Sequence, residues 1–198
     1  MLDIPKKCYV NKFLPKKIFY EKIALSQSVK EEFTNQVDRI TWLYKISPDT
    51  IGINKTDNVE EIEVFQLDLK EKMIPKNVIK VITKGIPYKI LFVIKFNDDF
   101  CYSVKVDDIF TTEWNDNINF VFNAINLEIV YENIVKSILK EESNNKKIDE
   151  IIDNRAYKAD LEKRINQLKQ KIKNEKQFNK KVELNKQLNE LLLEEKNV

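Results

Sequence analysis

Histidine is absent from this sequence of 198 residues. Because the histidine side chain is the usual proton acceptor near neutral pH and a frequent zinc ligand, its absence excludes Ser-His-Asp and Cys-His catalytic sites and histidine-ligated zinc. Glycine is nearly absent as well, with only Gly52 and Gly85. These two positions are too far apart to form a glycine-rich loop around the phosphates of a nucleotide, which excludes the P-loop and the dinucleotide-binding motif.

Cysteine and long apolar runs are also scarce. The two cysteines, Cys8 and Cys101, do not form a CxxC pair, and we expect free thiols in a reducing compartment rather than a disulfide. The first ten residues, MLDIPKKCYV, lack the apolar segment of a signal peptide, and no apolar run approaches the length of about 18 residues that spans a membrane. These features predict a cytoplasmic protein without a membrane segment.

The composition is sufficient for a folded domain and changes near Glu141. Hydrophobic residues make up 42% of the chain, which supports a sizeable core. The 34 basic and 32 acidic residues leave a net charge of +2, so there is no global basic excess of the kind that indicates nucleic-acid binding. After Glu141 there is no glycine, proline or tryptophan. We therefore divide the chain into a globular domain over residues 1–142, a linker over 143–154 and a helical arm over 155–198.

Hydrophobic periodicity in the first part predicts both helices and strands. The expected helices cover residues 12–25, 28–40, 75–85 and 127–139. The expected strands cover residues 40–46, 60–70, 88–96, 100–106 and 110–114, and the run at 88–96 is apolar enough for a central strand. This order predicts an α/β protein of the α+β type, in which helices cover a mixed sheet.

The arm carries an apolar seam with coiled-coil spacing. Four residues recur at steps of four, three and four positions: Leu161, Ile165, Leu168 and Ile172. The phase then shifts to a second stripe, formed by Phe178, Val182, Leu184, Leu188 and Leu191. A single long helix with a stutter and a hairpin that breaks near residues 173–176 both fit this pattern. We favour the continuous coiled-coil helix, because neither glycine nor proline supports a break.

An acidic strand offers one candidate for catalysis. A helix, two strands, a helix and a strand, in that order, are the elements of the PD-(D/E)xK nuclease core, where acidic residues bind Mg²⁺ and a lysine helps to activate water. Asp68 and Lys70 have the spacing of its D-x-K triplet, and residues two apart on a strand share a face. Further acidic ligands are available at Glu61, Glu63, Asp49 and Asp57. Because 33% of the residues are charged, such a triplet also arises by chance, and a solvated strand edge is the alternative.

The arm also carries a basic segment. Residues 161–181 hold eight basic and two acidic side chains, whereas residues 183–195 hold four acidic side chains and one lysine. Basic side chains can follow a phosphate backbone, and the candidates for such contacts are Lys163, Arg164, Lys169, Lys171, Lys173 and Lys176. Charged flanks also solvate coiled coils, and antiparallel pairing of the arm with itself would bring the opposite charges together. We favour helix pairing over nucleic-acid binding.

The strand segment at residues 42–45, with the sequence WLYK, is the third candidate. Its aromatic rings can stack on a nucleobase. Trp42 and Tyr44 at a spacing of two residues are more often part of a core, and we favour that interpretation. We also expect Cys101 to be a small buried apolar residue.

Several phrases occur together in one order along the chain. They are LPKKIFY at 14–20, ITWLYKISP at 40–48, EIEVF at 61–65, IPYKILF at 86–92, TEW at 112–114, YEN at 131–133 and EKQFNKKVELN at 175–185. With these phrases the sequence resembles the bacterial DUF4391 family over essentially the whole chain. The resemblance implies a gene context similar to that of accessory genes beside helicases and DNA methyltransferases, in restriction-like or anti-phage defence clusters. Lysine at the Lys70 position is not a dependable feature of the family pattern, so Glu61 is the first carboxylate to test.

We expect the protein to be an accessory or adaptor subunit of a bacterial DNA-processing defence system. Its partner would be a helicase or DNA methyltransferase subunit, or a second copy of the chain, bound through the apolar residues of the arm. No cofactor or metal is expected for this role. The first alternative is a Mg²⁺-dependent nuclease, and the second is a nucleic-acid-binding module that uses the basic arm.

Overall fold

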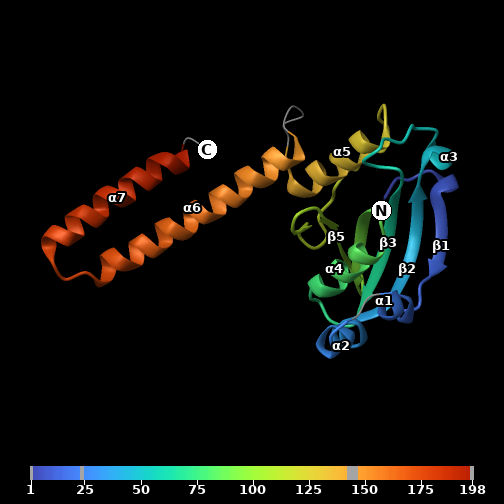
Figure 1. Ribbon diagram of the computed structural model, residues 1–198, viewed down its shortest axis with the longest axis horizontal. Helices are drawn as coiled ribbons and strands as arrows, with labels where there is room; N and C mark the ends of the chain where they lie inside the picture. Colours follow the sequence, from blue (N-terminus) through green and yellow to red (C-terminus); the bar gives the residue numbers. More distant parts are fainter. Residues whose placement is uncertain (1, 23–24, 142–146, 197–198) are drawn as a thin grey trace. The chain divides into compact units, whose positions relative to one another are not determined.

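The computed structural model describes residues 2–22, 25–141 and 147–196, and the chain divides into two units, Met1–Glu142 and Ser143–Val198. The first unit contains a six-stranded sheet with helices against it, and the second contains two long helices (Figure 1). This arrangement confirms the predicted α+β class. Within the described ranges, no helix combines the length and the apolar character needed to cross a membrane.

Six strands form one mixed sheet in the order of the chain. They are β1 (Tyr9–Phe13), β2 (Val37–Ile46), β3 (Ile62–Leu69), β4 (Lys89–Phe96), β5 (Asp99–Lys105) and β6 (Ile109–Thr111). Neighbouring strands are antiparallel except for the central pair, β3 and β4, which is parallel. A parallel pair requires a crossover between its strands, and the helix α4 (Lys76–Gly85) lies in that connection. Strand β4 lies between β3 and β5 in the interior of the sheet, as its apolar sequence predicts.

The other helices of this unit are η1 (Lys6–Cys8), α1 (Lys17–Lys22), α2 (Gln27–Asn35), α3 (Pro48–Ile51) and α5 (Leu127–Leu139). Two of them, α2 and α5, begin with a polar N-cap residue. At the start of α2, the Ser26 hydroxyl accepts a hydrogen bond from the amide of Val29. At the start of α5, the Asn126 side chain does the same for the amide of Ile129. Gly52 ends α3 with a φ of 70°, a left-handed conformation that glycine adopts without strain.

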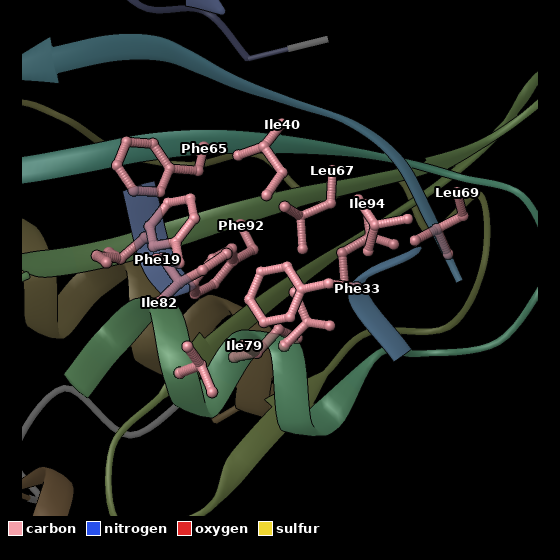
Figure 2. Packing of buried hydrophobic residues seen from close by; sticks show 14 of the residues in the cluster. Phe19, Phe33, Ile40, Phe65, Leu67, Leu69, Ile79, Ile82, Phe92 and Ile94 are labelled. Carbon is pink, nitrogen blue, oxygen red and sulfur yellow. The ribbon is translucent and has the colours of Figure 1, made fainter. Parts of the chain in front are cut away.

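One face of the sheet packs against α1, α2 and α4 (Figure 2). Side chains alternate between the two faces along a strand, so Phe65 and Leu67 of β3 point to the same side of the sheet. They form one buried cluster with Phe92 of β4, Phe33 of α2 and Ile79 of α4. Burial of side chains of this size stabilises the fold by about 1.5–3 kcal/mol each, so this cluster is a main determinant of the stability of the first unit.

The opposite face of the sheet packs against α5, which contacts β5 and β6. Val64 of β3, Leu91 of β4 and Val104 of β5 belong to this face and are fully buried. Leu127 and Ile134 are fully buried on α5. With helices on both faces, the central strands β3 and β4 are buried over most of their length, which explains their nearly continuous apolar sequences.

Two local predictions near the N-terminal end of the sheet are wrong. Residues 12–25 do not form one helix, because their first residues pair as β1 with the edge of β2 and α1 covers only Lys17–Lys22. The helix predicted over 28–40 is too long, since α2 ends at Asn35 and β2 begins at Val37. Val37 and Ile40 still face the same core, because the register shifts between Val37 and Arg39 and adds one residue between them.

Both cysteines are free and buried, as the sequence predicts. Removal from water raises the pKa of the Cys101 thiol to about 12. The thiol therefore stays protonated and packs as a small apolar group, in agreement with the interpretation of Cys101 as a core residue.

The second unit is a hairpin of two helices, α6 (Ile148–Asn174) and α7 (Phe178–Lys196), which pack against each other (Figure 1). The favoured continuous helix is therefore wrong, and the alternative, the hairpin, is present. The chain leaves helical geometry at Glu175, whose φ of −74° and ψ of 131° are extended. The Glu175 carboxylate accepts a hydrogen bond of 2.8 Å from the amide of Gln177. Because this break needs no positive φ, it needs no glycine.

The boundary of the hairpin also differs from the prediction. Helix α6 begins at Ile148, inside the range 143–154 predicted as a linker, while residues 143–146 lie outside the described residues. Asp149 and Glu150 occupy the first turn of α6. Acidic side chains at this position interact favourably with the free amides and the dipole of the helix start, which accounts for the earlier beginning.

Candidate functional site

Glu63 is an acidic side chain enclosed within the first unit. It lies on β3 and has only 4% of its surface exposed. Its position along the strand places it on the same face as Phe65 and Leu67, the face covered by α1, α2 and α4. The indole Nε1–H of Trp42 donates a hydrogen bond of 2.5 Å to Glu63 Oε2. A buried carboxyl among apolar side chains is costly unless such a partner is present.

A bulge in β2 gathers the neighbours of Glu63 on one face. The register of β2 against β3 shifts after Trp42. As a result, Trp42 lies opposite Phe65 and Lys45 lies opposite Glu63. Trp42 and Lys45 are three residues apart and would face opposite sides of a regular strand, but the extra residue of the bulge turns both to the same face. Lys45 Nζ then forms an ion pair of 2.8 Å with Glu61 Oε1. The bulge therefore brings one lysine and two carboxyl groups to the same end of the sheet.

This environment favours the neutral form of Glu63. Removal from water raises the pKa of Glu63 from 4.5 to about 7, the hydrogen bond from Trp42 opposes that shift, and the nearby charge of Glu61 adds to it. The pKa of Lys45 is raised as well, chiefly by its hydrogen bond to Glu61. Lys45 therefore remains an ammonium, while Glu63 can take up or release a proton near neutral pH.

A pocket of about 210 Å³ opens beside Glu63. It is lined by Leu14, Ile18, Phe19, Trp42, Glu63, Phe65, Gly85, Ile86 and Tyr88. The walls thus come from α1 and the residue segment before it, from β2 and β3, and from the connection between α4 and β4. Among these lining residues, Glu63 is the only charged one. The pocket is therefore an apolar and aromatic space with one carboxyl group in its wall.

The predicted catalytic residues fall into two separate places. Glu61 and Glu63 lie together with Lys45, as described above. Asp68 lies five positions beyond Glu63 on β3, about 16 Å away at the rise of a strand and on the opposite face, where Oδ1 accepts a hydrogen bond of 2.8 Å from Gln66. Lys70 follows the end of β3 and is exposed. The described part of the chain contains no group of three His, Cys, Asp or Glu side chains placed to hold a metal.

The other two acidic candidates precede Glu61 and Glu63 in the chain. Asp49 and Asp57 are both exposed, Asp49 on α3 and Asp57 in the segment before β3. The sequence places Lys45 in the aromatic and basic segment at 42–45 and not with the acidic candidates of the segment at 60–70. Antiparallel pairing of the predicted strands at 40–46 and 60–70 could have placed Lys45 opposite the acidic segment, but the bulge that turns it to the face of Glu63 has no signal in the sequence.

The apolar seam of the arm is largely used within the hairpin. Leu161, Ile165 and Leu168 on α6 are buried. Four further seam residues are half-buried: Ile172, Leu184, Leu188 and Leu191. The seam that the sequence assigns to a partner thus provides the packing between α6 and α7.

The basic residues proposed for nucleic-acid binding are all exposed on the hairpin: Lys163, Arg164, Lys169, Lys171, Lys173 and Lys176. Part of this charge lies beside acidic residues of α7, because Arg164 lines the same groove as Glu190 and Glu194. The Tyr157 hydroxyl also donates a hydrogen bond to Glu194. The antiparallel hairpin therefore brings basic α6 and acidic α7 segments together, as expected for self-pairing of the arm.

Three large apolar residues remain exposed on one side of α7. Phe178, Val182 and Leu193 have 78%, 54% and 62% of their surfaces exposed. At 100° per residue, the three side chains project within about 60° of one another around the helix. Phe178 is among the predicted partner-binding residues and Val182 belongs to the predicted second stripe, whereas Leu193 is in neither set. A separate helical projection of residues 178–196 could have identified Leu193, since the break at Glu175 sets a new phase.

The two units together define the class of the protein, an α+β domain with a mixed six-stranded sheet followed in the chain by a helical hairpin. The chain belongs to the DUF4391 family, described as a domain of unknown function, whose family model matches residues 2–194. This match confirms the resemblance seen in the sequence. Comparisons with curated proteins and with solved structures gave no match.

Proposed function

We propose that the protein is a cytoplasmic accessory subunit of a bacterial DNA-processing system, of the restriction-like or anti-phage type, and that its helical hairpin binds a protein partner. The observation that supports this role is the exposure of three large apolar residues on one side of α7, Phe178, Val182 and Leu193. The partner is a helicase or DNA methyltransferase subunit, in keeping with the gene context that the DUF4391 resemblance implies.

The shape of this face suits a helix of another protein. Single exposed apolar residues are normal on a protein surface, but Phe178, Val182 and Leu193 lie on one side of one helix. They extend over about 22 Å at 1.5 Å per residue. Asn185 and Asn189 lie between Val182 and Leu193 on the same side of the helix, so the apolar residues form two anchors, Phe178 with Val182 and Leu193, to which an amphipathic partner helix can bind. The seam between α6 and α7 is already buried, so the partner binds the outer face of the hairpin and not its interior.

Charge along α7 can set the orientation of the partner. The first two turns of α7 carry Lys180, Lys181 and Glu183, whereas its last two turns carry Glu190, Glu194, Glu195 and Lys196, so the net charge changes from positive to negative along the helix. A partner helix with acidic residues beside the first group and basic residues beside the second is electrostatically complementary. This gradient also disfavours a continuous nucleic-acid surface along α7, because a phosphate backbone would meet the acidic turns.

Replacing the three exposed residues of α7 by serine is expected to weaken partner binding strongly. Apolar residues at the centre of an interface contribute about 2 kcal/mol each when they are hot spots. We therefore expect the triple variant Phe178→Ser, Val182→Ser and Leu193→Ser to bind at least about 30-fold more weakly. Calorimetric titration against the purified helicase and methyltransferase subunits encoded beside the gene measures this change, and light scattering measures self-association.

Ile125→Ser provides the control for this experiment, because Ile125 is also apolar and 80% exposed but lies in the first unit. It should bind the partner as the unmodified protein does. Equal affinity of the triple variant and the unmodified protein would contradict the proposal. A loss of self-association alone would identify the partner as a second copy of the chain.

A Mg²⁺-dependent nuclease is the second candidate. Apart from the short helix α3 between β2 and β3, the order α2, β2, β3, α4, β4 matches the order of elements in the PD-(D/E)xK core. The grouping of Glu61, Glu63 and Lys45 at one end of β2 and β3 also favours this function. In this function the two carboxylates would hold the metal and Lys45 would take the place of Lys70.

The nuclease candidate predicts that Glu61→Gln abolishes Mg²⁺-dependent cleavage of plasmid DNA, because one metal-binding carboxylate is lost. Asp68→Asn is the control, since Asp68 lies on the other face of β3 and should not affect cleavage. Gel analysis of plasmid conversion with Mg²⁺ or Mn²⁺ measures both. Absence of cleavage by the unmodified protein under these conditions would reject this candidate.

A further inference from the structure

We propose that the pocket beside Glu63 binds a small organic ammonium ion with an apolar body. The pocket lies in the first unit, so ligand binding there does not depend on partner binding by the hairpin. Three properties of the pocket define the ligand: its size, the apolar character of its walls, and the single carboxyl group among its lining residues.

The size and walls of the pocket limit the body of the ligand. Its volume of about 210 Å³ equals the space of about seven water molecules in the liquid. A ring or short chain of about eight non-hydrogen atoms therefore fits. Leu14, Ile18 and Phe19 form one wall and Ile86 another, so an apolar body gains free energy by leaving water.

The carboxyl group defines the charge of the ligand. A carboxylate can accept several hydrogen bonds, and the indole of Trp42 supplies one of them to Glu63. An ammonium group can supply further hydrogen bonds and the opposite charge. The aromatic rings of Phe19, Trp42 and Tyr88 line the same space, and aromatic faces attract cations. A neutral hydrocarbon would fill the pocket without pairing the carboxylate.

The charged surroundings of Glu63 favour a cation over an anion. Glu61 precedes β3, Lys45 lies on β2 and Tyr88 precedes β4, whereas α1 contributes the apolar residues Ile18 and Phe19 to the lining. Lys45 is engaged by Glu61 at 2.8 Å, so these two charges compensate each other. Ionised Glu63 therefore leaves the group with one net negative charge, which repels anions and is neutralised by one ammonium.

Benzylamine and benzyl alcohol are matched probes for this site, because they share a shape and differ in charge. The chain has two tryptophans, so the Nε1–H resonance of Trp42 can be assigned by NMR with the Trp114→Phe variant. Benzylamine is expected to shift this resonance in a saturable manner. Benzyl alcohol should bind at least tenfold more weakly, because it cannot neutralise the carboxylate.

Glu63→Gln and pH test the same contact in two further ways. The amide keeps the size of the side chain but removes its charge, and we expect benzylamine to bind it about 10–100-fold more weakly. Burial holds the pKa of Glu63 at about 7, whereas benzylamine stays protonated through mildly alkaline pH. Its affinity for the unmodified protein should therefore fall about 30-fold between pH 8.5 and pH 5.5.

Three results would overturn the proposal. Equal affinity for benzylamine and benzyl alcohol would show an apolar pocket without a role for the carboxylate. No shift of the Trp42 resonance with either probe would show that the pocket is not a ligand site. Paramagnetic broadening of that resonance by Mn²⁺, without a shift by benzylamine, would assign Glu63 to the metal site of the nuclease candidate instead.

Discussion

Replacing Ile79 by alanine is expected to lower the free energy of unfolding of the first unit by about 2–5 kcal/mol. Ile79 is fully buried on α4 and belongs to the cluster that contains Phe33 and Phe92 (Figure 2). The substitution removes buried apolar surface and leaves a cavity between the helix and the sheet. Alanine is the better helix former, so the loss reports packing and not helix propensity.

Urea denaturation followed by tryptophan fluorescence measures this effect selectively, because Trp42 and Trp114 both lie in the first unit. Ile125→Ala is the matched control, since the same side chain is 80% exposed at that position. Its stability should stay within about 0.5 kcal/mol of the unmodified protein. Similar losses for both variants would contradict the assignment of the core.

Glu63→Gln is expected to remove a pH dependence of stability of about 3 kcal/mol. Burial raises the pKa of Glu63 from 4.5 to about 7. Between these two values the folded protein retains a proton that the unfolded chain has released. The contribution of Glu63 to stability is therefore highest below pH 4.5 and falls as the pH rises to about 7. Glutamine does not titrate, so this decline disappears.

Urea unfolding at a series of pH values between 4.5 and 8 gives the required comparison. Glu60→Gln is the control, because its side chain is 56% exposed and lies in the same segment. This variant should keep the pH dependence of the unmodified protein. If Glu63→Gln keeps it as well, the buried carboxyl does not have the raised pKa that its environment indicates.

The sequence predicts the strands of the sheet well, and the reason is physical. The run at 88–96 is apolar on both sides, which is typical of a strand with helices on both faces, and β4 has that position. The segment at 12–25 could not be assigned in the same way, because β1 is stabilised by hydrogen bonds to β2 and not by its own apolar pattern. The pairing of β1 with the distant strand β2 thus overrides the helical pattern of the local sequence.

The site could be predicted in part. Glu61 and Glu63 were among the acidic candidates, but their partner Lys45 lies on another strand and is brought close by the bulge after Trp42. A bulge leaves no clear signal in a single sequence. The hairpin was one of two alternatives that fit the arm, and the continuous helix was favoured over it because the break at Glu175 uses an ordinary extended conformation and requires no special residue.

The parallel pairing of β3 and β4 has a consequence for how the chain acquires its structure during synthesis. An antiparallel neighbour of β3, the strand β2, is made before it, whereas β4 is made only after the crossover through α4. Phe65 and Leu67 therefore remain without one side of their packing until residues 89–96 have left the ribosome. The nascent chain thus exposes the apolar side chains of β3 for the time needed to translate the crossover, and a chaperone can protect them during this interval.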